Sequence, residues 1–340
     1  MLYKVLSDMA RCLPFRWYGG KYSHLKWLLP QLPEAHRYVE PFGGSGAVLL
    51  NRDPSPVEVY NDRDSDVTNF FKVLRDNRDE LLEKIALTPF SREEFEHAIE
   101  RQGDDLSDIE QARLFFVRAG QVRSGLAQDA TPGRWAYCKS ASRRDMASAV
   151  SRWHSRLDHL KEAADRIGGY SEVEAVIEEL KQEGKEAIAD ELQGMNNQEA
   201  VKALQEAKLE DMADRFRRVQ IENRDAIDVI QTYGDSEDAL IYCDPPYPHD
   251  SRSQGTTTTY RYEMSDEEHK DLANVLHEVE AKVAISSYQC DLTEELYGDW
   301  NRIDIKKTSH TSKETREESL WTNYPIPNPE AEKVQATIRL

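Results

Sequence analysis

Residues that could hold a planar amine stand directly after an apolar run. Residues 239–243 read Ala-Leu-Ile-Tyr-Cys, which predicts a buried strand, and Asp244, Pro245, Pro246 and Tyr247 follow. Two prolines hold the backbone extended and remove two N–H donors, which leaves carbonyl oxygens free to accept. Asp244 and the Pro245 carbonyl could each accept one N–H of an exocyclic amine, and Tyr247 could stack on the ring that carries it. The alternative interpretation is a plain proline-rich turn.

A glycine-rich turn and a carboxylate near the start of the chain predict a second part of the same site. Residues 41–46 read Pro-Phe-Gly-Gly-Ser-Gly after a predicted strand at Tyr38-Val39, and we expect residues 47–50 to open a helix. Glycines permit a tight turn and close approach of the backbone to a ligand. The turn lacks the GxGxxG and GKS/GKT patterns, so a phosphate-cradling loop is disfavoured. Asp62, which ends a second predicted strand, could accept from ribose hydroxyls or instead cap the next helix.

An aromatic and basic segment lies just before the first predicted helix. Residues 15–21 read Phe-Arg-Trp-Tyr-Gly-Gly-Lys. Trp17 could pack against a cofactor and Lys21 could pair with a carboxylate. Alone, the segment is equally compatible with an ordinary loop.

The order of predicted elements indicates an α/β fold that is interrupted once. Short apolar runs alternate with helical patterns in the first third of the chain and again after Arg218, which is typical of a parallel sheet. Helical spacing with polar interruptions fills the middle. We expect a discontinuous α/β domain of residues 1–76 and 216–324, a helical domain of residues 77–215, and a tail of residues 325–340.

Local patterns refine this organisation. Ser265 precedes three acidic residues in a capping pattern, which predicts the start of a helix. Residues 300–305 and 320–324 could pair as a terminal hairpin. Apolar residues within 173–180 and 200–212 mark two further helices, which lie in an acidic segment of the interrupting domain.

The charge distribution is more informative than the net charge of −19. Residues 113–156 hold nine Arg or Lys against two acids, a local charge of +7, whereas residues 162–214 hold fifteen acids against five bases, or −10. An acidic chain is a poor partner for a polyanion, but one basic segment can supply the local positive potential that nucleic acid requires. A salt-adapted surface is the alternative explanation of the acid excess.

Composition disfavours several other classes. No stretch approaches the roughly 20 apolar residues that span a bilayer, and the N-terminus lacks the apolar core of a signal peptide. The four cysteines lie far apart without zinc spacing, which argues against a metal site or a disulfide framework. We therefore expect a cytoplasmic protein with no membrane partner and no metal.

Taken together, the motifs resemble those of the Dam-like (D12 class) DNA adenine-N6 methyltransferases, which use S-adenosyl-L-methionine. The resemblance covers roughly residues 15–77 and 219–324, with weaker similarity over 118–137. It rests on aromatic-x-Gly-Gly-Lys, Pro-Phe-x-Gly-x-Gly and Asp-Pro-Pro-Tyr, which match as they stand. It implies a Rossmann-like S-adenosylmethionine-dependent methyltransferase sheet with an inserted helical target-recognition domain, here residues 77–215. Tyr18 departs from the family pattern, because a small residue often holds its position.

The resemblance also assigns roles. Asp244, Pro245, Pro246 and Tyr247 would be the catalytic residues, acting on adenine N6 of a base flipped out of duplex DNA. Lys21 would lie near the carboxylate of the cofactor and Asp62 would bind its ribose. The full set of implied cofactor contacts is Trp17, Lys21, Phe42, Gly44, Gly46, Asp62 and Asp225.

The basic segment is the expected DNA face, because Arg and Lys neutralise phosphates and Arg can read guanine. The candidate contacts are Arg118, Arg123, Arg134, Arg143 and Arg252. A solvated helix surface is the alternative for any one of them. A cognate restriction enzyme is a candidate partner.

Two other functions stay open at this point. A methyltransferase that acts on RNA adenine or on cytosine N4 could use related motifs, although the latter usually has Ser in place of Asp244. A catalytically silent DNA-binding module would tolerate loss of Asp244 or Gly44, and both are present.

Overall fold

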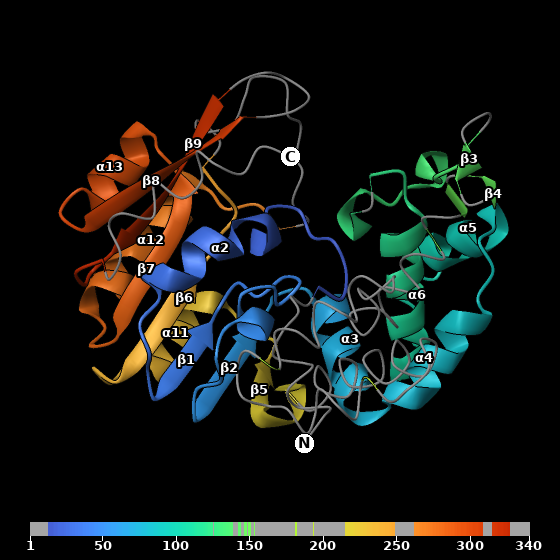
Figure 1. The fold of residues 1–340 in the computed structure, drawn as a ribbon, viewed down its shortest axis with the longest axis horizontal. Helices are drawn as coiled ribbons and strands as arrows, with labels where there is room; N and C mark the ends of the chain where they lie inside the picture. The colour runs from blue at the N-terminus through green and yellow to red at the C-terminus, as the bar shows by residue number, and fades with distance from the viewer. Residues whose placement is uncertain are drawn as a thin grey trace. The chain divides into compact units, whose positions relative to one another are not determined.

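A computed structural model describes most of the chain and divides it into two compact units (Figure 1). One unit comprises Met1–Trp17 with Asn69–Arg217, and the other comprises Tyr18–Thr68 with Arg218–Leu340. The described residues are 13–124, 126–138, 142–143, 146–147, 149–150, 153, 181, 193, 215–248, 262–308 and 315–326. The two predicted acidic helices and nearly all of the predicted tail lie outside them.

The second unit is built on a seven-stranded sheet with the order β5-β2-β1-β6-β7-β9-β8. The first five strands in this order are parallel, and β9 and β8 run antiparallel to their neighbours. The mixed sheet confirms the predicted α/β fold class and is consistent with the methyltransferase sheet that the resemblance implies. The strands are β1 (Arg37–Glu40), β2 (Val57–Asn61), β5 (Val219–Glu222), β6 (Ala239–Cys243), β7 (Lys282–Tyr288), β8 (Asn301–Thr308) and β9 (Thr315–Thr322).

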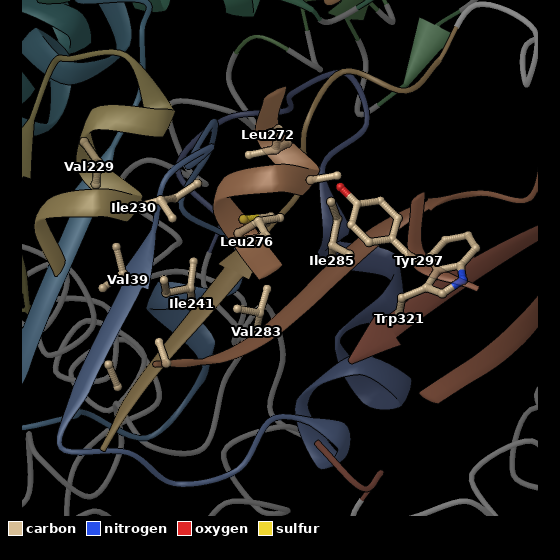
Figure 2. Close-up of a cluster of buried hydrophobic side chains, with 14 of the residues drawn as sticks. Val39, Val229, Ile230, Ile241, Leu272, Leu276, Val283, Ile285, Tyr297 and Trp321 are labelled. Carbon is tan, nitrogen blue, oxygen red and sulfur yellow. The ribbon is translucent and has the colours of Figure 1, made fainter. Parts of the chain in front are cut away.

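Three helices pack on the sheet around a single apolar cluster (Figure 2). They are α11 (Ala226–Tyr233), α12 (Asp266–Glu278) and α13 (Asp291–Tyr297). Their apolar side chains, such as Ile230 and Leu276, point toward Ile241 and Val283 of the central strands. Each such fully buried side chain contributes about 1.5–3 kcal/mol relative to exposure, so the cluster holds the strands in place.

Short helices precede the first strand, and one longer helix follows the second. The former are η1 (Lys21–His24), α2 (Leu25–Leu28) and η2 (Leu29–Gln31). The latter is α3 (Ser65–Asp76), and its buried apolar residues recur at helical spacing.

Two local predictions in this unit are confirmed. Ser265 caps α12 in a reciprocal capping box: its side chain accepts from the Glu268 N–H, and the Glu268 carboxylate accepts from the Ser265 N–H. The terminal hairpin forms between β8 and β9, with Asn301 opposite Thr322.

The helix expected from residue 47 does not form, and that prediction is wrong. The structure has only a short 3-10 turn, η3 (Leu49–Asn51), and the chain is extended at Arg52. Pro54 and Pro56 disfavour helical backbone in the residues that precede them, and β2 begins at Val57. The connection is therefore too short for a helix.

The described part of the first unit is mainly helical. It contains α4 (Arg78–Leu87), α5 (Arg92–Glu100) and α6 (Asp108–Gln121), with 3-10 turns η4 (Ala127–Asp129) and η5 (Pro132–Arg134) and the short strands β3 (Ser142–Arg143) and β4 (Met146–Ala147). Ser91 and Ser107 cap α5 and α6 through their hydroxyls. Phe15, 5% exposed, packs with Phe70, Phe71 and Phe115 at centroid distances of 5.0–5.7 Å.

The glycine-rich turn follows β1 and needs its glycines. Gly44 and Gly46 have φ of 50° and 65°, a left-handed backbone that favours glycine. Gly43 donates from its N–H to the Asn61 carbonyl (2.8 Å), and a Cβ placed on Gly43 would lie 2.1 Å from Cε2 of the Tyr60 ring. The turn is therefore pressed against β2, and its position is fixed by the buried Tyr60.

The Gly43 contact gives a stability prediction. Gly43→Ala should lower the free energy of unfolding by about 1–3 kcal/mol, because the buried ring must shift to admit the methyl group. Thermal and urea unfolding measure the effect. Gly133→Ala is the matched control, since nothing lies within 4 Å of a Cβ there, and it should change stability by less than about 0.5 kcal/mol. Equal stability of the two variants would contradict this packing.

Candidate active site

Four loops meet where the parallel strands end. The carboxyl ends of parallel strands share one edge of a sheet, which is where ligands bind in open α/β folds. The buried side chain of Asn61, at the end of β2, joins three of these loops. Its amide donates to the carbonyls of Pro41 (2.9 Å) and Arg224 (3.2 Å), and its Oδ1 accepts from the Arg224 N–H (2.9 Å). The glycine turn, the Asp62 loop and the loop before α11 are thereby held together.

Asp62 lies against the glycine turn. Its carboxylate accepts from the backbone N–H groups of Gly44 and Asp64, both at 2.8 Å. Burial raises the pKa of Asp62 to about 6, although these two hydrogen bonds oppose the rise. The alternative that Asp62 caps the next helix is wrong, because Asp64 directly precedes α3 and accepts from the Asp66 N–H (3.0 Å).

Asp244 follows β6 and forms a buried ion pair that the sequence did not predict. Lys21 Nζ lies 2.5 Å from Asp244 Oδ1 and 3.3 Å from Glu318 Oε1, and it also donates to the Gly19 carbonyl (2.9 Å). Glu318 Oε2 lies 3.1 Å from His24 Nε2. Lys21 is 3% exposed, whereas the Asp244 side chain is 16% exposed. The catalytic candidate therefore keeps some access to solvent while the ammonium has almost none.

Burial and charge set the ionisation of this cluster. Burial raises the pKa of Asp244 to about 6, against the opposing effect of the Lys21 charge. Burial alone would lower the pKa of Lys21, but the charges of Asp244 and Glu318 outweigh it and raise that pKa. Burial likewise works against the ionised form of Glu318, yet Lys21 and His24 lower its pKa. Lys21 and Glu318 are thus charged at neutral pH.

Tyr247 is also held in this cluster. Its hydroxyl donates to Glu318 Oε1 (2.8 Å), and its ring meets Tyr288 edge-on at 4.7 Å between centroids. Lys21 Nζ lies 5.0 Å from the centroid of the Tyr247 ring. Only 5% of Tyr247 is exposed, and its stacking on a base stays a prediction.

Other predicted cofactor residues have observable structural roles. Asp225 caps α11 by accepting from the Ile227 N–H (3.0 Å). Phe42 packs against the apolar cluster of the sheet. Trp17 belongs to the first unit, where its ring lies 5.9 Å from that of Phe15.

The predicted DNA contacts divide into three groups. Arg118 is 3% exposed and donates to the Ala98 carbonyl (2.8 Å), so its assignment to the DNA face is wrong: it is buried between helices. Arg123 and Arg134 are exposed, and the Arg123 N–H donates to the Arg134 carbonyl (2.8 Å). Arg143 lies in β3, where only its backbone is described, and Arg252 lies outside the described residues.

Comparison with known proteins identifies the family. A model of the D12 class N6 adenine-specific DNA methyltransferases matches residues 17–311. The chain belongs to this family. It is therefore an adenine-specific DNA methyltransferase by family, and methyltransferases of this kind in general use S-adenosylmethionine.

Individual relatives of the chain are also named as methyltransferases or methylases. The chain is 24% identical over 331 residues to the type II methyltransferase M1.LlaDCHI of Lactococcus lactis subsp. cremoris, an alignment that covers 92% of this chain and 95% of that protein. It is 38% identical over 72 residues to the DNA N-6-adenine-methyltransferase of Escherichia phage P1, or 21% of this chain and 9% of that protein. It is 44% identical over 62 residues to a DNA adenine methylase of Vibrio cholerae, or 18% and 21%.

The donor set of the site fits the cofactor of this family. Asp62 offers carboxylate oxygens of the kind that bind ribose hydroxyls, and the left-handed Gly44 and Gly46 have no side chain to block close approach. Among the described residues, no group of three or more His, Cys, Asp or Glu could hold a metal ion, and no helix is long and apolar enough to cross a membrane.

Three residues of the site were not predicted from the sequence. Asn61 adjoins the predicted Asp62, so its place at a strand end was a usable signal. His24 and Glu318 carried no such signal, because Glu318 lies in the antiparallel hairpin and reaches the site only through the order of the sheet.

Glu40, at the end of β1, gives a prediction for the pH dependence of stability. Its buried Oε2 accepts from the Tyr38 hydroxyl (3.1 Å) and the Leu49 N–H (2.9 Å), and burial raises its pKa to about 8. The folded state thus holds this proton more tightly than the unfolded chain, so stability should fall as pH rises from about 5 to about 8. Glu40→Gln removes the titration and should gain about 1–4 kcal/mol relative to the wild type across that window.

Urea unfolding of both proteins at several pH values measures this difference. A stability difference that stays constant from pH 5 to pH 8 would contradict the raised pKa of Glu40.

Proposed function

We propose that this protein transfers a methyl group from S-adenosyl-L-methionine to N6 of an adenine flipped out of duplex DNA at a specific sequence. The observation that carries the proposal is the placement of Asp244 at the carboxyl edge of the parallel sheet. The glycine turn and Asp62 lie at the ends of neighbouring strands of the same sheet. Family membership supports the reaction class.

Asp244 and the Pro245 carbonyl hold the amine. The lone pair of adenine N6 is delocalised into the ring, which makes it a poor nucleophile. Two acceptors on its hydrogens favour a tetrahedral nitrogen and stabilise the positive charge that develops there. Lys21 contacts Asp244 at Oδ1, and a carboxylate has acceptor sites on both oxygens, so the amine can be accepted while Lys21 stays in place.

The glycine turn and its neighbours orient the methyl donor. Gly44 and Gly46 have no side chain to block close approach of the donor to the backbone, and Asp62 accepts from its ribose hydroxyls. The remaining proposed contacts to the donor are Trp17, Lys21, Phe42 and Asp225. The donor would supply an electrophilic methyl group on a sulfonium and would leave as a neutral thioether, and the methylated nitrogen would lose one proton. Holding the amine in line with that methyl lowers the entropic part of the barrier. No covalent enzyme intermediate is needed, so none of the cysteines is expected to act as a nucleophile.

DNA engagement is proposed for the exposed arginines of the first unit. An antiparallel bridge joins Val122 to Trp135, which places Arg123 and Arg134 side by side. Trp135 and Tyr137 stack next to them at 6.4 Å. Adjacent cations suit consecutive phosphates of one strand. Since one full-length relative is named a type II methyltransferase, a cognate restriction enzyme is a candidate partner.

Removal of the Asp244 carboxylate tests the chemistry. Asp244→Ala should lower methyl transfer by at least about 100-fold, because the developing positive charge loses its main stabilising group. Binding of S-adenosylmethionine, measured by calorimetry, should persist. Tritiated-methyl assays on duplex DNA, duplex RNA and single strands, with the methylated base identified, separate adenine-N6 from cytosine-N4 transfer. Near-normal methylation by the variant would refute the assignment.

Paired arginine variants test the DNA face. Replacing Arg123 and Arg134 together by Ala should weaken duplex binding and reduce the slope of log affinity against log salt by about 2, one for each phosphate contact. Arg101→Ala is the matched control, because this partly exposed arginine of the same unit pairs with Asp104, and it should leave both quantities unchanged. An unaltered salt slope in the double variant would place the DNA face elsewhere.

A further inference from the structure

Glu318 is a buried carboxylate that touches three residues of the site. It comes from β9, in the antiparallel part of the sheet, and is 4% exposed. Its Oε1 accepts from the Tyr247 hydroxyl (2.8 Å) and lies 3.3 Å from Lys21 Nζ, and its Oε2 lies 3.1 Å from His24 Nε2. Both oxygens are thus engaged, which fixes the orientation of the carboxylate.

The charge of Glu318 changes the net charge of the cluster. Lys21 with Asp244 alone would be a neutral pair, and a neutral pair stabilises a developing cation poorly. A second carboxylate on the same ammonium leaves Lys21, Asp244 and Glu318 with a combined charge of −1 when His24, on the far oxygen of Glu318, is neutral. Because the Asp244 side chain is more exposed than that of Glu318 (16% against 6%), the excess negative charge is presented where the substrate amine is proposed to bind.

We propose that Glu318 is a positioning residue for methyl transfer: it offsets the positive charge of Lys21 and holds the Tyr247 hydroxyl, so that the ammonium does not cancel the negative charge of Asp244 where the amine binds. The inference rests on the proposed function and deepens it. His24, on the far oxygen, holds Glu318 in place. A structural alternative exists, in which Glu318 only ties β9 to η1, and the experiment must separate the two roles.

The test is the single-turnover rate of methyl transfer to duplex DNA by Glu318→Gln. This variant keeps the shape of the side chain and an acceptor for the Tyr247 hydroxyl but removes the charge. We expect the rate to fall about 10- to 100-fold, somewhat less than for loss of a group that contacts the reacting atoms. Affinities for S-adenosylmethionine and DNA should change less than about threefold, since a group that acts on the transition state alters kcat rather than binding.

The pH dependence of the transfer rate distinguishes the two roles, because a purely structural role of Glu318 would leave it unchanged. Among the described residues, the titratable groups that interact with Asp244 are Lys21, Glu318, Tyr247, Glu40, Tyr242 and Cys243. Of these, Glu318 raises the pKa of Asp244 and Lys21 lowers it. Loss of the Glu318 charge should therefore shift the acid limb of the rate profile to lower pH, although the rate itself is lower.

A second background isolates the charge effect. In Lys21→Met no ammonium needs neutralising, so adding Glu318→Gln should cost less than about threefold, and the two changes should be strongly non-additive. Glu294→Gln on α13, a surface carboxylate paired with Arg302, is the charge-matched control and should behave as the wild type. Thermal unfolding of each variant is measured in parallel.

The outcomes are distinct. No transfer to DNA by the wild type overturns the proposed function and this inference with it. If the wild type transfers the methyl group and Glu318→Gln does so at an equal rate, the inference alone is overturned. It is also overturned if Glu318→Gln lowers the rate by the same factor in the Lys21→Met background as in the wild type. If Glu318→Gln does not fold, His24→Asn replaces it: a rate about threefold or more below wild type supports the role, and a wild-type rate overturns it.

Discussion

The site depends on burying one ammonium group. Removing Lys21 from water costs several kcal/mol unless opposite charges compensate, and its location is specified by the two carboxylates that do so. Asp244 arrives from the end of β6 and Glu318 from β9, so the ion pairs join the segment before β1 to two strands far away in sequence. Any conformation that moves one of these segments leaves a buried charge without its partner. The cluster therefore fixes η1, the Asp-Pro-Pro-Tyr turn and the β8–β9 hairpin relative to one another.

A second constraint, from neutral hydrogen bonds, acts on the other half of the site. Asn61 uses both ends of its amide to hold the glycine turn and the loop before α11. Gly43 has no room for a side chain beside Tyr60, so the turn can approach β2 only as glycine. These contacts place Asp62 against Gly44 without an ion pair. The cofactor half is thus held by hydrogen bonds between side chains and backbone groups, and the catalytic half by ion pairs.

Local sequence predicted the elements whose causes are local. The apolar run at residues 239–243 predicted β6, and the capping pattern at Ser265 predicted the start of α12. The failed helix after residue 47 had a local cause as well, since Pro54 and Pro56 stand in the sequence. Arg118 follows the apolar run of α6, and its burial was likewise indicated by helical spacing. In both cases the sequence contains the signal for the observed structure.

Glu318 could not be predicted in the same way. Its neighbours in sequence are those of an ordinary strand, and its contacts depend on which strand lies beside β7. A parallel sheet predicts that residues at strand ends meet, but the antiparallel β9 brings a residue from within the strand to that edge. Sequence patterns thus located the motifs that follow parallel strands and missed the carboxylate contributed by the antiparallel one.

The same burial that makes the site useful makes it costly to fold. Glu40, Asp62 and Asp244 all have raised pKa values because they are buried, and each ionised form therefore opposes folding at neutral pH. The opposing contribution comes from the apolar cluster between the sheet and helices α11, α12 and α13. This division has a consequence for substitution: apolar changes in that cluster alter stability first, whereas charge changes at the strand ends can raise stability while they remove activity. A variant that becomes more stable on loss of a buried carboxylate therefore shows that this carboxylate is not kept for the stability of the fold.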